Sequence, residues 1–157
     1  MFTGLNKEKR FLTILFLISL TIRFVAFNQF FSKDKNYWNM DTIAYNEAAT
    51  SLYEGKGFRN ADGSYHFYRL PLYPAFLALC YKLFGPDIKN ALWVQLFLAS
   101  FIPILIFLLS LSIFPARILL ARALSLLCTF HLGFILYSCI AMSETIFLIF
   151  FFIFCIL

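Results

Sequence analysis

Residues 91–114 read ALWVQLFLASFIPILIFLLSLSIF, an apolar stretch that contains no charged side chain. A membrane-spanning helix needs about 20 consecutive apolar residues, and this stretch has that length. Pro103 lies within it and predicts a kink, because proline lacks the N–H group that a helix interior requires. The sequence therefore predicts a kinked transmembrane helix over residues 91–114.

Three further apolar stretches lie on either side of this one, at about residues 11–31, 118–137 and 145–157. The first two have the length of a spanning helix, whereas the last is shorter. With 62% hydrophobic and 13% charged residues, the chain lies outside the composition of soluble proteins. We therefore predict an all-α fold: a polytopic transmembrane bundle of about four spans, the last one truncated, in one incomplete domain over residues 1–157.

The basic residues indicate how the chain is threaded through the membrane. Three of them precede the first span, and Arg117 and Arg122 flank the link between the second and third spans. Cationic residues near spans favour the cytoplasmic side, so both places are expected there. This topology accounts for the net charge of +5 without a nucleic-acid partner. It predicts an integral membrane protein with a cytoplasmic N-terminus and an outer loop over residues 32–86.

The predicted outer loop contains two helical segments. The first begins at Asp41, has alanines and a leucine at helical spacing, and ends before Gly55 and Gly57. The second, PLYPAFLALCYKLF over residues 71–84, is apolar but too short to cross a bilayer. We expect it to lie at the membrane interface, with prolines in its first turn and Gly85 at its end.

Two roles fit Asp41, which opens the segment DTIAYNEAATSLYEGKGF. As the N-cap of the helix, its carboxylate would accept hydrogen bonds from backbone N–H groups. At a membrane surface of low dielectric, it would also serve as a general base. The two roles are compatible.

Two other charged residues are expected on the same side of the membrane. Arg69, in YRLPLYP, has the bidentate geometry that suits phosphate, either of lipid headgroups or of a ligand. Glu144 opens the fourth apolar stretch, where an acidic side chain with Ser143 would cap the helix. If the topology is right, Glu144 and Asp41 face one aqueous side.

Polar residues inside the predicted spans allow fewer conclusions. Arg23 lies within the first span, where an arginine either serves a function or extends its side chain toward the interface. His131, in the third span, is expected to be a hydrogen-bonded interior residue, because no acidic partner lies at helical spacing. The cysteines have no paired spacing and are expected to be packing residues. They are Cys80, Cys128, Cys139 and Cys155.

Three motifs follow one another along the chain. The first, D-x-x-x-Y-x-x-x-A-x-x-L-x-x-G-x-G, starts at Asp41, the second is R-L-P-L-Y-P from Arg69, and the third is Ser143-Glu144. In this order, between and before apolar spans, they resemble the N-terminal part of the C-type polytopic glycosyltransferases. The most similar group is that of the bacterial relatives of the protein O-mannosyltransferases and the lipid A aminoarabinose transferases.

The resemblance implies transfer of a sugar, with inversion, from a polyprenyl-phosphate carrier to a hydroxyl of a lipid, glycan or protein at the outer membrane face. It assigns Asp41 as the catalytic base, Arg69 as the partner of the donor phosphate, and Tyr45 and Glu144 as substrate-binding residues. Thr42 stands where many members have a second acidic residue. Some members use a divalent metal and others do not, so the resemblance leaves both alternatives open, and no metal ligand is assigned.

Alternative functions follow from other features of the sequence. Arg23 and His131 within spans would suit part of a transporter or a lipid flippase, although most polar residues lie in the outer loop. The end of the chain inside an apolar stretch would suit an inactive remnant. Under the glycosyltransferase interpretation, we expect the isolated chain to be inactive.

Overall fold

The computed structural model describes residues 2–31, 40–60, 62–65 and 69–157. Within these residues the chain is helical, and its one extended pairing is an antiparallel bridge between Arg59 and Tyr65. The all-α prediction is confirmed. In chain order, the helices are α1 (Phe2–Ala26), which continues into the π-helical turn η1 (Phe27–Phe31), α2 (Met40–Tyr53), α3 (Leu72–Phe84), α4 (Ile88–Ala99), α5 (Ile102–Ile113), α6 (Ile118–Phe130), α7 (Leu132–Cys139) and α8 (Glu144–Ile156).

Two stretches are long and apolar enough to cross a membrane: Lys7–Gln29 in α1 with η1, and Ile88–Ile113 across α4 and α5. Helices α6 and α7 make a third if they are counted as one span bent by 49°. Helix α8 is apolar but has 13 residues, which extend about 20 Å at 1.5 Å per residue, less than the hydrocarbon thickness. The described residues therefore hold two or three helices of spanning length, consistent with an integral membrane protein, where about four spans were predicted.

The second predicted span breaks earlier than expected. Helix α4 ends before Ser100, and α5 starts after Phe101, so Pro103 lies in the first turn of α5 and not at the kink itself. A proline ring excludes the carbonyl of the residue four positions before it, so the interruption falls on the N-terminal side of the proline. In the first turn of a helix, backbone N–H groups have no intrahelical partner, so a proline there costs no helical hydrogen bond.

The third predicted span, residues 118–137, is interrupted at His131, whose extended backbone (φ −67°, ψ 117°) separates α6 from α7. Gly133 permits this geometry, because a Cβ atom there would lie 3.0 Å from Cε1 of His131. The side chain of His131 is exposed, and its ring lies 5.1 Å from that of Phe134 between centroids. The prediction of an interior, hydrogen-bonded histidine is therefore wrong.

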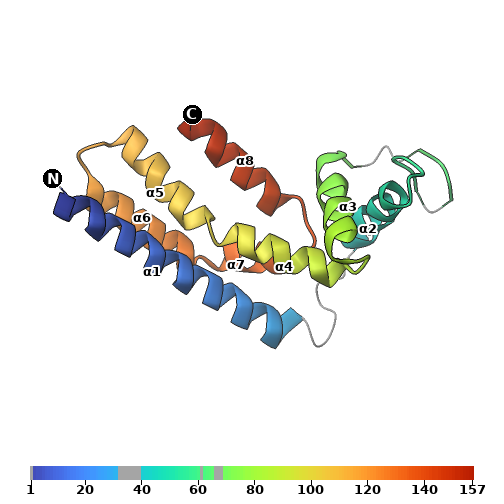
Figure 1. The fold of residues 1–157 in the computed structure, drawn as a ribbon, viewed down its shortest axis with the longest axis horizontal. Coiled ribbons are helices and arrows are strands. Elements are labelled where there is room, and N and C mark those ends of the chain that lie inside the picture. The colour runs from blue at the N-terminus through green and yellow to red at the C-terminus, as the bar shows by residue number, and fades with distance from the viewer. Residues whose placement is uncertain (1, 32–39, 61, 66–68) are drawn as a thin grey trace.

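The helices of spanning length lie alongside one another, with the N-terminus and the α5–α6 link at one end and the α2–α3 pair at the other (Figure 1). At the N-terminal end, Arg122 forms an ion pair with Glu8. This pair holds the start of α6 against the start of α1. The basic residues that were expected on the cytoplasmic side therefore lie at the same end of the molecule.

A single core joins α2 and α3 to the rest of the molecule. Helix α2 is followed by Gly55 and Gly57, with φ of 75° and 81°, a region that favours glycine, so the chain turns there as predicted. Helix α3 begins after Pro71 and is capped by Gly85. The buried residues of this core come from η1, α2, α3, α4, the end of α7, the link that follows it and the start of α8, and they are Phe27, Tyr45, Ala49, Tyr73, Leu77, Cys80, Tyr81, Ile88, Ala91, Leu92, Leu96, Cys139, Ala141 and Ile146.

Candidate functional site

An ion pair between Asp41 and Arg69 joins the start of α2 to the segment that precedes α3. Asp41 follows Met40 in the first turn of α2, so it lies inside the helix and not at the N-cap position considered from the sequence. A carboxylate in this turn also interacts favourably with the helix dipole. The guanidinium carbon of Arg69 lies 5.5 Å from the ring centroid of Tyr45. A carboxylate and an aromatic ring thus position the guanidinium.

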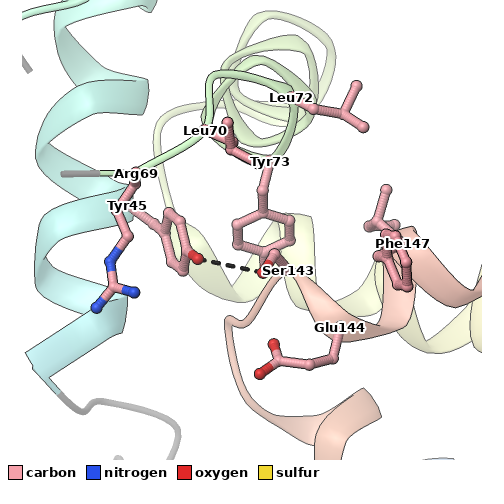
Figure 2. Close-up of a pocket in the computed structure, with 9 residues that line it drawn as sticks. Tyr45, Arg69, Leu70, Leu72, Tyr73, Ser143, Glu144 and Phe147 are labelled. Atoms are coloured by element: carbon pink, nitrogen blue, oxygen red, sulfur yellow. Dashed lines mark hydrogen bonds between the residues drawn. The ribbon is translucent and has the colours of Figure 1, made fainter. Parts of the chain in front are cut away.

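Two hydrogen bonds tie α2 to the link between α7 and α8. The Tyr45 hydroxyl donates to Oγ of Ser143 at 3.2 Å, as Figure 2 shows. The buried Thr42 hydroxyl donates to the backbone carbonyl of Ala141 at 3.4 Å. Because Tyr45 and Ser143 are far apart in sequence, these bonds fix a tertiary contact that no local pattern specifies.

Gln95 of α4 fixes the same link from the other side. Its Oε1 accepts a hydrogen bond of 2.7 Å from the hydroxyl of Tyr73. Its Nε2 donates to backbone carbonyls at the end of α7 and after it, at distances of 2.8 to 3.3 Å. These carbonyls belong to Tyr137, Ser138 and Ile140. Burial raises the pKa of Tyr73 well above its ordinary value, so this phenol remains a hydrogen-bond donor.

These contacts enclose a cavity of about 380 Å³ between α2, the segment that leads into α3, and the start of α8. Figure 2 shows the ring of Tyr45 beside that of Tyr73, with Glu144 and Phe147 on the facing helix. The two tyrosine rings meet edge to face, with centroids 4.9 Å apart. The lining residues are Tyr45, Arg69, Leu70, Leu72, Tyr73, Ser143, Glu144, Ile146 and Phe147. The volume is that of a small-ligand site.

Glu144 is the acidic group of this cavity. It lies in the first turn of α8, after Ser143 at the N-cap position, and Ser143 makes no side-chain cap bond. Glu144 therefore has the first-turn position considered from the sequence, where it interacts favourably with the helix dipole. The Ser143 hydroxyl makes no cap bond and instead accepts a hydrogen bond from Tyr45. Atom Oε2 of Glu144 is buried and has no hydrogen-bond partner among the described residues. An unpaired buried carboxylate oxygen is costly, so a hydrogen bond from a ligand or a water molecule would stabilise it.

The site residues assigned from the sequence lie close together, although three separate segments supply them. Tyr45, Arg69 and Glu144 line the cavity, while Asp41 contacts Arg69 and is not a lining residue. Sequence reasoning missed Tyr73 and Gln95. Gln95 could have been found from the sequence, because it is the one amide side chain in the apolar stretch 91–114, and polar groups inside a span are often functional. His66 and Tyr68, which received no role from the sequence, lie outside the described residues.

Arg23 lies away from this site and inside the helical bundle. Its side chain is fully buried, so the alternative in which it extends to the interface is wrong. Atom Nη1 donates to the backbone carbonyl of Ser19 at 3.2 Å and to the Ser19 hydroxyl. Atoms Nε and Nη2 are buried and have no hydrogen-bond partner among the described residues. A guanidinium with so few partners is costly in an apolar bundle.

Within the described part of the chain, no group of three or more His, Cys, Asp or Glu side chains could hold a metal ion. The four cysteines are free; three are buried, as expected of packing residues, and Cys155 is exposed. A comparison of the chain with protein-family models, with curated proteins and with solved structures finds no match.

Proposed function

We propose that this chain belongs to a membrane glycosyltransferase that moves a sugar from a polyprenyl-phosphate carrier to an acceptor hydroxyl. One observation carries the proposal: Tyr45, Arg69 and Glu144, from three segments of the chain, line a single cavity beside the apolar helices. The motifs that contain these residues resemble those of polytopic glycosyltransferases. The resemblance and the convergence of the residues therefore support the same site.

The donor phosphate would bind at Arg69. When the bond between the sugar carbon and the phosphate oxygen breaks, negative charge develops on the departing polyprenyl phosphate. A guanidinium stabilises such charge through two parallel hydrogen bonds, and Asp41 already orients this one. The neighbouring Leu70 and Leu72 are exposed and offer apolar surface to the polyprenyl chain.

The acceptor hydroxyl must lose its proton as its oxygen attacks the sugar carbon and inverts it. A carboxylate within reach of the hydroxyl serves as the base. Two carboxylates lie at the proposed site, those of Asp41 and Glu144.

The sidedness of the reaction follows from the distribution of charge. Basic residues precede the first span and flank the α5–α6 link, at the end of the molecule opposite α2 and α3 (Figure 1). Because such residues favour the cytoplasm, the cavity would face the outside of a bacterial cell membrane. A polyprenyl-phosphate donor and a lipid, glycan or protein acceptor would meet there.

The test is a substitution in the chromosomal gene, so that every segment of the natural protein is present. Membranes are incubated with polyprenyl phosphate that carries radiolabelled sugar, and label is measured in lipid, glycan and protein fractions. Arg69→Gln is expected to lower transfer by about 100-fold or more, the effect of removing a group that stabilises developing charge. Arg59→Gln is the matched control, because Arg59 lies in the same outer segment and its guanidinium contacts Lys56, Gly63 and Tyr65, away from the cavity.

Two results would contradict the proposed function. One is equal labelling in membranes with and without the gene. The other is wild-type transfer by Arg69→Gln when the protein level in the membrane is unchanged.

A second function is favoured by a different observation, the buried Arg23. A cation inside the bundle, near Cys128 of α6 and Cys139 of α7, would suit movement of a lipid phosphate across the membrane. The purified chain would then accelerate exchange of fluorescent polyprenyl phosphate between the leaflets of vesicles, and Arg23→Met would slow it. An exchange rate equal to that of protein-free vesicles would exclude this function.

A further inference from the structure

We infer that Glu144, and not Asp41, is the base that takes the proton from the acceptor hydroxyl, and that the cavity lined by Tyr45, Tyr73 and Glu144 holds the acceptor. The resemblance assigns the base role to Asp41. The inference rests on the proposed function and changes the assignment of its residues.

The first argument is the state of the two carboxylates. Oδ1 of Asp41 already accepts a hydrogen bond from the Arg69 guanidinium, and Asp41 does not line the cavity. Oε2 of Glu144 is buried, has no hydrogen-bond partner among the described residues, and belongs to a cavity-lining residue. A base must reach the proton that it removes, either directly or through one water molecule. Of the two carboxylate residues, Glu144 is the one that lines the cavity, so it is the one placed beside a hydroxyl bound there.

The second argument is the fixed position of Glu144. Thr145, the next residue, donates from its hydroxyl to the carbonyl of Tyr137 at 3.0 Å. The preceding residue, Ser143, is held by Tyr45 at 3.2 Å, and Gln95 holds the carbonyl of Ile140 at 2.8 Å. These bonds restrain the backbone on both sides of Glu144. Such restraint is expected around a group that must meet a reacting atom within a fraction of an ångström.

The third argument is the shape and chemistry of the cavity. Tyr45, Tyr73 and Phe147 supply aromatic surface, and the Ser143 hydroxyl and the Glu144 carboxylate supply polar contacts (Figure 2). The volume of about 380 Å³ accommodates a small hydroxylated group. Sugar rings have apolar faces and polar edges, so a sugar-borne hydroxyl fits this lining. We therefore assign the acceptor to the carbohydrate class.

In the proposed step, the acceptor oxygen forms a bond to the sugar carbon while its proton passes to the carboxylate of Glu144. The bond between that carbon and the phosphate oxygen breaks, and its electron pair leaves with the polyprenyl phosphate. Arg69 faces the departing phosphate. Asp41 acts as a positioning residue, because it orients the guanidinium and touches no reacting atom.

The test compares variants of the two carboxylates in membranes from cells with the altered chromosomal gene, with the radiolabelled polyprenyl-phosphate sugar as donor and the native membrane acceptor. Glu144→Gln is expected to lower kcat by about 100-fold to 10,000-fold, the effect of losing a general base, with the donor KM unchanged. Asp41→Asn is expected to raise the donor KM more than it lowers kcat. Glu47→Gln on α2 is the control, because Glu47 lies outside the cavity lining.

A second measurement separates a base from a structural residue. The variant Glu144→Ala leaves space at the carboxylate, so added formate is expected to restore part of the transfer rate. The same formate concentration is expected to leave Asp41→Ala without recovery. If Glu144→Gln does not reach the membrane, Glu144→Asp keeps the carboxylate and is expected to transfer at a reduced rate.

Each outcome decides between the two assignments. Wild-type kcat in Glu144→Gln, or formate rescue of Asp41→Ala and not of Glu144→Ala, overturns the inference while the proposed function stands. Absence of gene-dependent transfer in the wild-type membranes overturns the proposed function, and the inference with it.

Discussion

Gln95 and Arg23 are both polar and both fully buried, yet their surroundings differ. Gln95, next to the candidate site, accepts a hydrogen bond from Tyr73 and donates to backbone carbonyls at the end of α7 and after it. Arg23, inside the bundle, bonds to Ser19 of its own helix, and two of its nitrogens have no partner among the described residues. Burial alone therefore says little about the contribution of a polar side chain to stability.

The difference follows from the cost of leaving a polar group unpaired. A satisfied buried amide contributes modestly, but its removal leaves its partners unpaired, at about 1–3 kcal/mol for each. An unpaired buried guanidinium already has this cost in the native state. We therefore expect substitutions of Gln95 and Arg23 to change stability in opposite directions.

The largest expected effect is that of Gln95→Leu. The change keeps the approximate volume but leaves the Tyr73 hydroxyl and several carbonyls without Gln95, so the free energy of unfolding should fall by about 3 kcal/mol or more. Denaturant titration in mixed micelles measures it. The control is Phe97→Leu on the same helix, at a side chain that is 48% exposed. An unfolding midpoint equal to that of the control would show that the Gln95 network has no net effect.

The next effect has the opposite sign. Arg23→Met removes the unpaired cation and keeps an apolar side chain of similar length, so the free energy of unfolding should rise by about 1–4 kcal/mol. The same titration applies, with Arg10→Met as control, because Arg10 is exposed. A lower midpoint for Arg23→Met would mean that the guanidinium stabilises the fold and would remove the contrast with Gln95.

A third prediction extends the contrast to a buried group whose charge depends on pH. Burial raises the pKa of Cys80 in α3 from 9.0 to about 11, so the folded protein favours the neutral thiol. The stability that this pKa shift contributes is fully present below pH 9, the ordinary thiol pKa. Above that pH the unfolded protein loses the thiol proton first, so the free energy of unfolding falls by up to about 1.4 kcal/mol per pH unit until the folded-state pKa is reached.

Unfolding titrations of Cys80→Ala between pH 8 and pH 10 measure this contribution, because the substitution should reduce the slope of the dependence that begins near the ordinary thiol pKa of 9.0. The tyrosines Tyr73 and Tyr81, whose pKa values burial also raises, act at higher pH. An unchanged slope in Cys80→Ala would contradict the assignment to Cys80.

The smallest expected effect on stability is that of Arg69→Gln. Arg69 and Asp41 are 36% and 34% exposed, and ion pairs that solvent reaches contribute at most about 1 kcal/mol. The unfolding midpoint should therefore change little, in contrast with the loss of sugar transfer proposed above. A decrease as large as that of Gln95→Leu would mean that Arg69 is a structural residue.

Much of the helical architecture could be predicted from the sequence, because apolar length and glycine and proline positions act locally. The segment 71–84, for example, contains α3 within one residue at its start. The break at His131 was missed, since it depends on close packing of that ring over Gly133. The direction of Arg23 was also missed, because a helix that is apolar on all faces has no pattern that shows which side is buried.

The candidate site shows the same division between local and tertiary information. Motif order led to the prediction that Asp41, Tyr45, Arg69 and Glu144 belong to one site, and three of them line one cavity while Asp41 pairs with Arg69. Their roles depend on contacts that the sequence does not specify, such as the pairing of Asp41 with Arg69 and the unpaired oxygen of Glu144. These contacts separate the two carboxylates and lead to the reassignment of the base.

The most direct test of the account is the proximity of α2 to the start of α8. The variant carries Thr42→Cys and Ala141→Cys in a chain whose native cysteines are replaced. Membranes that contain it are treated with the shortest bifunctional thiol reagent, because Thr42 and Ala141 share a hydrogen bond of 3.4 Å. A protease site in the exposed turn at Lys56 is then cut. The control pairs Thr42→Cys with native Cys155, near the opposite end of α8.

The account predicts that the two fragments stay joined on a denaturing gel for the 42–141 pair and separate for the control. Separation of the fragments in both cases would contradict it, because α2 would then lie away from Glu144 and no shared cavity could form.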